Sequence, residues 1–240
     1  SNTILIGVPN KLLLKQWGAI ICDIFSNTPY LIVSGGVNTE QIVKFLQKEK
    51  KGIVITTYAS SCKVYKATTN IDFVFDMKIN DEVHHLTSNN LNTEGKTYVN
   101  MLKIKSKKQL SLTATLKILE NQENKRDEDI VVSNDHVEYF GEIIEKKGLL
   151  WAIDENIICD YDIQTIVTDE EQIEQVFSKF GIVEDKDRRL FLASYASLKS
   201  ISDNNSHHLL IYSNNKDNSL KLIQYIKILL DDKYFDIPDL

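Results

Sequence analysis

The sequence predicts an α/β fold in which a parallel β-sheet is flanked by helices. Short apolar runs recur along the first half of the chain, as expected for strands that are buried on both faces. Segments with apolar residues at helical spacing lie between these runs, and the runs end in proline, glycine or polar residues. Strands and helices that alternate in this way form parallel sheets, whose ligands bind at the carboxyl ends of the strands.

The elements of the first half follow from these patterns in order. Pro9 ends the first apolar run, Gly35-Gly36 ends the second, and Asn38 or Thr39 can cap the helix that follows. The expected strands are Ile4–Val8, Tyr30–Val33, Ile53–Thr57, Ile71–Asn80 and Gln109–Thr113, and the expected helices are Lys11–Phe25 and Glu40–Lys48.

A charged stretch at residues 119–135 separates this half from the next. Beyond it we expect strands at Val137–Phe140 and Glu142–Ile144, a helix near Gly148–Asp154, a strand at Ile157–Val167, a helix from Thr168 or Asp169 to Phe180, a helix at Leu190–Asp203, a strand at His208–Tyr212 and a helix at Ser219–Asp231. The predicted domains are a first unit at 1–130, a bridge at 131–168 and the start of a second unit at 169–240.

Composition excludes several classes of protein. A net charge of −6 and a pI of about 5.4 argue against a charge-driven nucleic-acid binder of the histone kind, although a local basic groove remains compatible with them. Cys22, Cys62 and Cys159 are far apart, which favours free thiols in a reducing, intracellular compartment over disulfides or zinc. No apolar run is long enough to cross a bilayer, and we expect neither a signal peptide nor a membrane partner.

The segment Asp81-Glu82-Val83-His84-His85 carries the strongest chemical signal, because it follows the fourth expected strand directly. Hydrolysis of a nucleoside triphosphate needs one carboxylate near magnesium and another that orients the attacking water. Adjacent acids at a strand end supply both. The competing interpretation is a solvated acidic turn beside two histidines without a role, and the five residues alone leave both open.

These residues resemble motif II of the DExH helicases of superfamily 2, and further segments resemble other motifs of that family in the family's order. They are Val8-Pro9-Asn10-Lys11 with Leu14, Gln16 and Trp17 (motif Ia), Gly35-Gly36, Ile55-Thr56-Thr57-Tyr58, Leu110-Ser111-Leu112-Thr113-Ala114-Thr115 (motif III), Phe140-Gly141-Glu142 with Ala152-Ile153 and Ile158-Cys159-Asp160-Tyr161 (the bridge of the restriction-enzyme-like branch), and His208–Tyr212 with Ser213-Asn214-Asn215 (motif IV).

The resemblance implies a RecA-like parallel sheet flanked by helices, in two lobes that are both incomplete. It implies ATP and magnesium as cofactors of a full-length helicase or translocase, with nucleic acid as partner and DNA favoured over RNA by the bridge. The implied roles are magnesium binding through water for Asp81, positioning of the attacking water for Glu82, coupling of ATP to strand movement for His84, Thr113, Ala114 and Thr115, and nucleic-acid contact for Pro9, Asn10, Lys11, Gly35, Gly36, Thr57, Tyr58 and Asn214.

The sequence departs from the family pattern in two places. It contains no Gly-x-x-x-x-Gly-Lys-Ser/Thr loop: Gly95-Lys96-Thr97 has Asn90 where the first glycine should be, and we expect a surface loop there. The motif V segment and the arginine-rich motif VI are also missing, and Arg188-Arg189 cannot be motif VI because it precedes motif IV. We therefore expect this chain alone neither to bind ATP and magnesium tightly nor to hydrolyse ATP.

Two other functions remain open from the residues. The chain could be a catalytically inactive helicase-like module that binds nucleic acid or protein, or an unrelated α/β hydrolase that uses Glu82 and His84. A further oddity is Lys78 in the fourth strand, which needs a partner such as Asp76 or an exposed position; we expect this strand to be a sheet edge.

Overall fold

The computed structural model describes residues 2–88, 97–119, 131–161, 163, 165, 167–203, 208–235 and 237. The chain forms two units, residues 1–146 and 147–240, which are described separately. Gly95-Lys96 and residues 120–130 of the charged stretch lie outside the described residues, so the predictions made for them stay predictions. None of the described helices is long and apolar enough to span a membrane.

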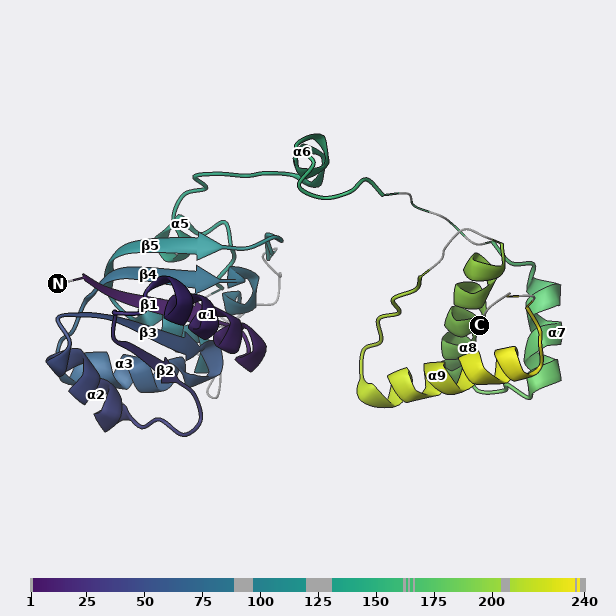
Figure 1. The fold of residues 1–240 in the computed structure, drawn as a ribbon, viewed down its shortest axis with the longest axis horizontal. Coiled ribbons are helices and arrows are strands. Elements are labelled where there is room, and N and C mark those ends of the chain that lie inside the picture. The colour runs from purple at the N-terminus through teal and green to yellow at the C-terminus, as the bar shows by residue number, and fades with distance from the viewer. Residues whose placement is uncertain are drawn as a thin grey trace. The chain divides into compact units, whose positions relative to one another are not determined.

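The first unit is built on a five-stranded, wholly parallel sheet, which confirms the predicted fold class (Figure 1). Its strand order is β2-β3-β1-β4-β5, so β1 lies at the centre. Ile6 of β1 pairs with Ile55 of β3 on one side and with Ile79 of β4 on the other. The strands are β1 (Asn2–Val8), β2 (Tyr30–Val33), β3 (Lys51–Thr57), β4 (Phe75–Asp81) and β5 (Ser106–Leu112).

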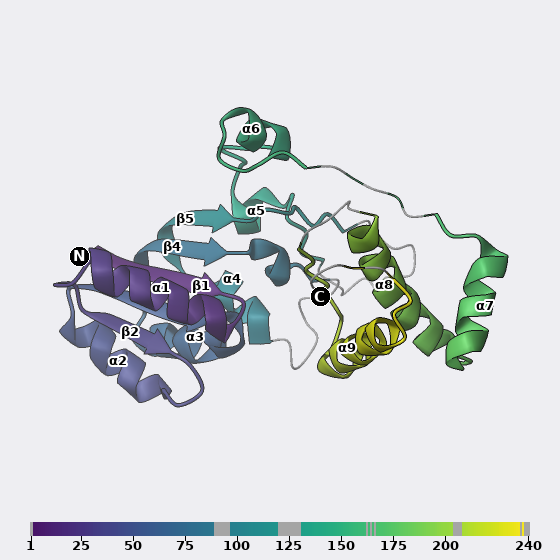
Figure 2. The ribbon, with the colours of Figure 1, turned by 45° about the vertical axis from the view of Figure 1, so that its right-hand side comes forward.

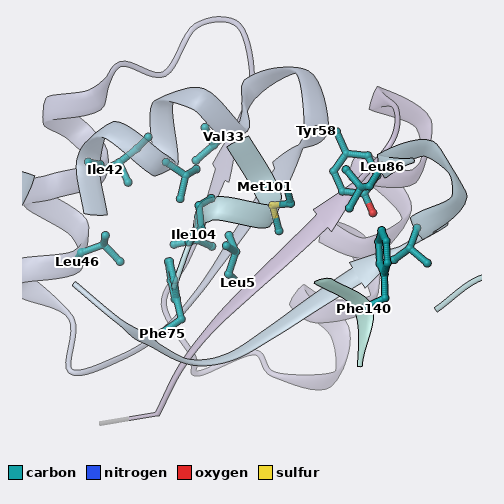
Figure 3. Close-up of a cluster of buried hydrophobic side chains, with 14 of the residues drawn as sticks. Leu5, Val33, Ile42, Leu46, Tyr58, Phe75, Leu86, Met101, Ile104 and Phe140 are labelled. Atoms are coloured by element: carbon teal, nitrogen blue, oxygen red, sulfur yellow. The ribbon is translucent and has the colours of Figure 1, made fainter. Parts of the chain in front are cut away.

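Helices cover both faces of this sheet (Figures 1 and 2). On one face Leu14 and Ile21 of α1 pack against Ile6 and Ile55. The larger core lies on the other face, where α2, α3 and α4 meet residues such as Leu5, and Figure 3 shows part of it. The helices of this unit are α1 (Lys11–Ile24), α2 (Thr39–Lys48), α3 (Ser61–Asn70), α4 (Asn100–Lys103) and α5 (Val137–Phe140), with short 3-10 helices η1 (Tyr58–Ser60), η2 (Val83–Leu86) and η3 (Thr97–Val99).

Asparagine side chains begin two of these helices. Oδ1 of Asn10 accepts from the backbone N–H groups of Leu12 and Leu13 at 2.9 and 3.0 Å, so only Pro9 and Asn10 separate β1 from α1. Asn38, and not Thr39, caps α2, through a reciprocal pair of bonds with Gln41.

The expectation that β4 is a sheet edge was wrong, because β4 pairs with both β1 and β5. Lys78 is buried there, and its Nζ donates to the backbone carbonyls of Met101 at 3.3 Å and Ile104 at 3.0 Å. Asp76 is not its partner and instead forms an ion pair with Lys107 at 2.6 Å. Burial lowers the pKa of Lys78 to about 8, since the charged form loses hydration there.

The second unit is helical in its described residues. It contains α6 (Leu149–Asp154), α7 (Glu170–Phe180), α8 (Asp185–Ser202) and α9 (Lys216–Asp231). Phe177 of α7, Phe191 and Leu198 of α8, and Leu229 of α9 form its core. Asp169 caps α7 through bonds to two backbone N–H groups, as expected from its side chain.

Four predicted strands of the second half were wrong. Val137–Phe140 is helix α5, while Glu142–Ile144, the described part of Ile157–Val167 and His208–Tyr212 have irregular backbone. A strand needs a neighbour to satisfy its backbone N–H and C=O groups, and the described residues beyond β5 form no ladder that these segments join.

Candidate functional site

The candidate site lies where parallel strands end together. Val8 pairs with Thr57, Gly7 with Asn80, and Asp81 with Leu112, so the turns that follow β1, β3, β4 and β5 emerge at one edge of the sheet. These turns carry the segments that resemble motif Ia, the Thr-Tyr signal, motif II and motif III. The edge is the usual place for a ligand on a parallel sheet.

Asp81 is held by two aromatic residues from other elements. Nε1 of Trp17 in α1 donates to Oδ2 of Asp81 at 2.8 Å. The hydroxyl of Tyr58 donates to the backbone carbonyl of Asp81, and the pKa of Tyr58 is raised by burial and by the nearby carboxylates. Tyr58 is fully buried, so its side chain supports the acidic turn and is not exposed to a nucleic acid, which differs from its predicted role.

Glu82 has a left-handed backbone, with φ 54° and ψ 52°. This conformation is unfavourable for a residue with a long side chain, and such residues concentrate at functional sites. The turn ends the strand sharply and begins η2. It brings Oε2 of Glu82 to 3.3 Å from Nδ1 of His84.

His84 joins the acidic turn to the Thr-Ala-Thr turn. Its Nδ1 lies 3.0 Å from Oγ1 of Thr113 and 3.4 Å from Oγ1 of Thr115. Because the Thr113 hydroxyl donates to the carbonyl of Thr115 at 2.9 Å, it can only accept from His84, which favours the tautomer with the proton on Nδ1. His85 stacks on His84 with ring centroids 4.3 Å apart, and burial and the neighbouring ring lower the pKa of His85. Ala114 is exposed at the apex of the turn.

The residues expected to contact nucleic acid are spread more widely. Asn10 caps α1, Lys11 is exposed beside it, and Pro9 and Thr57 are buried. The exposed Gly35-Gly36 loop follows β2, at the outer edge of the sheet. Asn214 belongs to the second unit, where its Oδ1 accepts from Nδ2 of Asn218 at 2.6 Å in the turn before α9.

Lys63 organises the glycine loop, a role that sequence patterns did not reveal. Its Nζ in α3 donates to the backbone carbonyls of Ser34, Gly35 and Val37 at 3.1, 2.9 and 2.7 Å. Three carbonyls that point at one ammonium group fix the direction of this part of the loop. The bond from Trp17 to Asp81 was also not predicted, because it joins residues that are distant along the chain.

The donor set at Asp81 fits a magnesium ion held mainly by water and phosphate. Among the described residues no group of three or more histidine, cysteine, aspartate or glutamate side chains could hold a metal ion by itself. Magnesium in nucleotide sites keeps several waters and takes one or two carboxylates, and Asp81 would supply one.

The first half of the chain is similar to proteins of known family and structure. Residues 1–118 match the model of the family described as type III restriction enzyme, res subunit. The structure resembles the ATP-dependent Type ISP restriction-modification enzyme LlaBIII bound to DNA, with a TM-score of 0.65 and 15% identity over 96% of this chain and 18% of that chain. It also resembles a nuclease-deletion mutant of the Type ISP restriction-modification enzyme LlaGI in complex with a DNA substrate mimic, with a TM-score of 0.51 and 20% identity over 65% of this chain and 14% of that chain.

A search of curated proteins found no match. The chain spans less than a fifth of the length of the two restriction enzymes, and at these identities the likeness concerns the fold. The family match and the parallel sheet nevertheless cover the same part of the chain. Residues 1–118 are therefore similar to domains of the res-subunit kind, and this supports the resemblance to a superfamily-2 helicase core in that part of the chain.

Proposed function

We propose that this chain is part of an ATP-dependent DNA translocase or helicase, in which hydrolysis is coupled to movement along the strand. The contact that carries the proposal is that of His84, whose Nδ1 lies 3.3 Å from Glu82 and 3.0 Å from Thr113. The imidazole of His84 thus lies between the carboxylate of Glu82, which is suited to position water, and the Thr113–Thr115 turn, which is suited to respond to the nucleic acid. An acidic turn without a function would not need this connection.

The acidic turn divides two tasks between adjacent side chains. Asp81, held through Oδ2, would bind magnesium through water, and Glu82 would orient the attacking water and accept its proton. Magnesium, when bound with ATP, neutralises charge on the phosphates. Movement of the Thr113–Thr115 turn would reach Glu82 through His84, and this path links the state of the nucleotide to the strand.

The nucleic-acid path of the first unit would run over the start of α1 and the glycine loop. Asn10 and Lys11 offer a helix start and an exposed cation to a phosphate, and Gly35-Gly36 offers exposed backbone ordered by Lys63. Asn214 is proposed to contribute from the second unit. DNA is favoured because the two restriction enzymes that this fold resembles were determined with DNA or a DNA mimic.

The second candidate is a helicase-like module that binds DNA or protein without hydrolysing ATP. Such a module would use the same exposed surface, which is the start of α1 with Lys11 and the Gly35-Gly36 loop. Against it stands the retained geometry of Glu82, His84 and Thr113.

ATPase assays separate the two functions. This chain and a version extended into the flanking coding sequence are assayed with and without single-stranded DNA, duplex DNA and RNA, and each is compared with its Glu82→Gln variant. The motor proposal expects hydrolysis by the extended protein alone, stimulation by DNA above RNA, and loss on Glu82→Gln. An extended protein that binds DNA yet never hydrolyses ATP would leave the binding module as the function.

A further inference from the structure

The hydrogen bond between Trp17 and Asp81 joins two segments that are 64 residues apart in the sequence. Trp17 lies in α1, which covers the face of the sheet formed by Ile6, Val8, Ile53 and Ile55. Asp81 is the last residue of β4. The bond therefore runs from a helix on one face of the sheet to the carboxylate proposed to serve magnesium.

This contact does more than provide a hydrogen-bond acceptor for the indole N–H of Trp17. Indole N–H groups find a partner when they are buried, and any nearby carbonyl would serve that need. Here the partner is a carboxylate, so the bond is of the stronger, charge-assisted kind. It occupies Oδ2 of Asp81 and fixes the rotation of the side chain, and Oδ1 is left as the second acceptor. A carboxylate that must present one oxygen to a hydrated ion gains from such a restraint.

The other end of α1 lies at the proposed nucleic-acid path. Asn10 caps the helix, Lys11 is its first residue, and Trp17 follows seven residues after the cap. At 1.5 Å per residue this separation is about 10 Å along a continuous hydrogen-bonded helix. A helix of this length moves as one body, so a displacement of Asn10 and Lys11 also displaces the indole.

We propose that Trp17 is a positioning residue whose indole N–H orients the carboxylate of Asp81, which serves magnesium. When a DNA phosphate binds at the N-terminus of α1, the helix moves and the indole changes the orientation of this carboxylate. The inference rests on the proposed function for the identity of the two ligands. The contact itself is independent of that function. Tyr58 completes the arrangement by restraining the backbone carbonyl of Asp81, so the side chain is the part that Trp17 controls.

Nitrogen-15 NMR of the indole groups tests the contact. The chain contains two tryptophans, so a Trp151→Phe background leaves the Trp17 Nε1–H as the one indole signal. Asp81→Asn keeps an oxygen acceptor but removes its charge, and it should move this signal upfield. Glu82→Gln removes the adjacent charge and should leave the signal nearly in place. A signal that ignores Asp81→Asn, or responds equally to both variants, overturns the inference.

Titration of the same labelled protein with a single-stranded DNA oligonucleotide tests the transmission. Binding, followed in parallel by fluorescence anisotropy of the oligonucleotide, should shift the Trp17 indole signal in proportion to occupancy. Lys11→Ala should weaken both changes together. If DNA binds and the indole signal does not shift, the proposed transmission from DNA to Asp81 is wrong. If the anisotropy measurement shows that DNA does not bind, both the proposed function and the proposed transmission are wrong. The response of the indole signal to Asp81→Asn still shows whether Trp17 contacts Asp81 in solution.

A functional comparison separates positioning from packing. In the extended protein, Trp17→Phe keeps most of the aromatic packing and removes the N–H donor. It should raise the magnesium concentration for half-maximal ATPase roughly tenfold, the size expected for a lost charge-assisted bond, with little change in the KM for ATP. Trp151→Phe should change neither quantity. If Trp17→Phe lowers the midpoint of unfolding but leaves the magnesium dependence unchanged, Trp17 is only a packing residue and the inference is wrong.

Discussion

Oε2 of Glu82 lies 3.3 Å from Nδ1 of His84 because the backbone of Glu82 turns into the left-handed region as β4 ends. The position proposed to activate water is thus also a position of backbone strain. Function and stability place opposite demands on it.

Glu82→Asn should therefore stabilise the fold while removing activity. Asparagine tolerates a left-handed backbone better than glutamate, so the free energy of unfolding should rise by up to about 1 kcal/mol. Urea denaturation measures this change, and Glu142→Asn provides a control at an exposed glutamate with ordinary backbone. A lower stability for Glu82→Asn than for Glu142→Asn would show that the strain is not significant.

Thr113→Val should uncouple the two turns. It removes the hydroxyl that lies 3.0 Å from His84 and bonds to the backbone of Thr115. We expect about 1 kcal/mol of lost stability, and in the extended protein a loss of DNA stimulation with basal ATPase retained. Thr115→Val should cause a smaller loss of stimulation, since its hydroxyl lies farther from the ring, at 3.4 Å. Equal losses of stimulation in the two variants would contradict the role given to Thr113.

Lys63→Met should weaken DNA binding through the shape of the glycine loop. The variant loses three bonds to the carbonyls of Ser34, Gly35 and Val37. Lys66→Met removes an equal charge from an exposed position on the same helix and controls for electrostatics. Fluorescence anisotropy should show roughly fivefold weaker binding for Lys63→Met than for Lys66→Met, about the value of one hydrogen bond. Identical affinities would mean that only charge matters.

Lys78 should make the first unit more stable in alkaline solution. Its pKa is about 8 in the folded protein and 10.5 as the ordinary value, so between these values the unfolded chain binds more protons. Stability must then rise with pH across this window, by as much as about 3 kcal/mol.

The measurement compares wild type with Lys78→Met by urea denaturation at pH 7.5 and pH 10.5. Other groups that titrate in this window cancel in the comparison. The free energy of unfolding of wild type, relative to that of Lys78→Met, should be larger at pH 10.5 than at pH 7.5. A difference independent of pH would mean that Lys78 keeps its ordinary pKa inside the sheet.

The sequence could predict the sheet because its strands are short apolar runs with clear ends. Tyr30–Val33 was placed to the residue, and β1 and β3 within two residues at each end. The same rule failed for Val137–Phe140 and His208–Tyr212, since a short apolar run is a strand only where a neighbour completes its hydrogen bonds.

The sequence predicted which turns of the candidate site would meet, but it did not predict the contacts of Trp17 and Lys63. Motif order placed Asp81, His84 and Thr113 on neighbouring turns, and the structure brings these turns together. The bonds of Trp17 and Lys63 could not be foreseen, because each depends on which strands are neighbours. If the sequence had shown that the first and fourth strands are neighbours, the contact between Trp17 and Asp81 could have been predicted.

The turn between β1 and α1 contains two residues, Pro9 and Asn10. A helix advances by about 100° per residue, so one residue added or removed within α1 ahead of Trp17 would swing the indole to another side of the helix. Because Asn10 caps the helix and Trp17 reaches Asp81, the spacing between them matters as much as the identity of either residue. An insertion of one residue between Asn10 and Trp17 should therefore abolish the bond to Asp81.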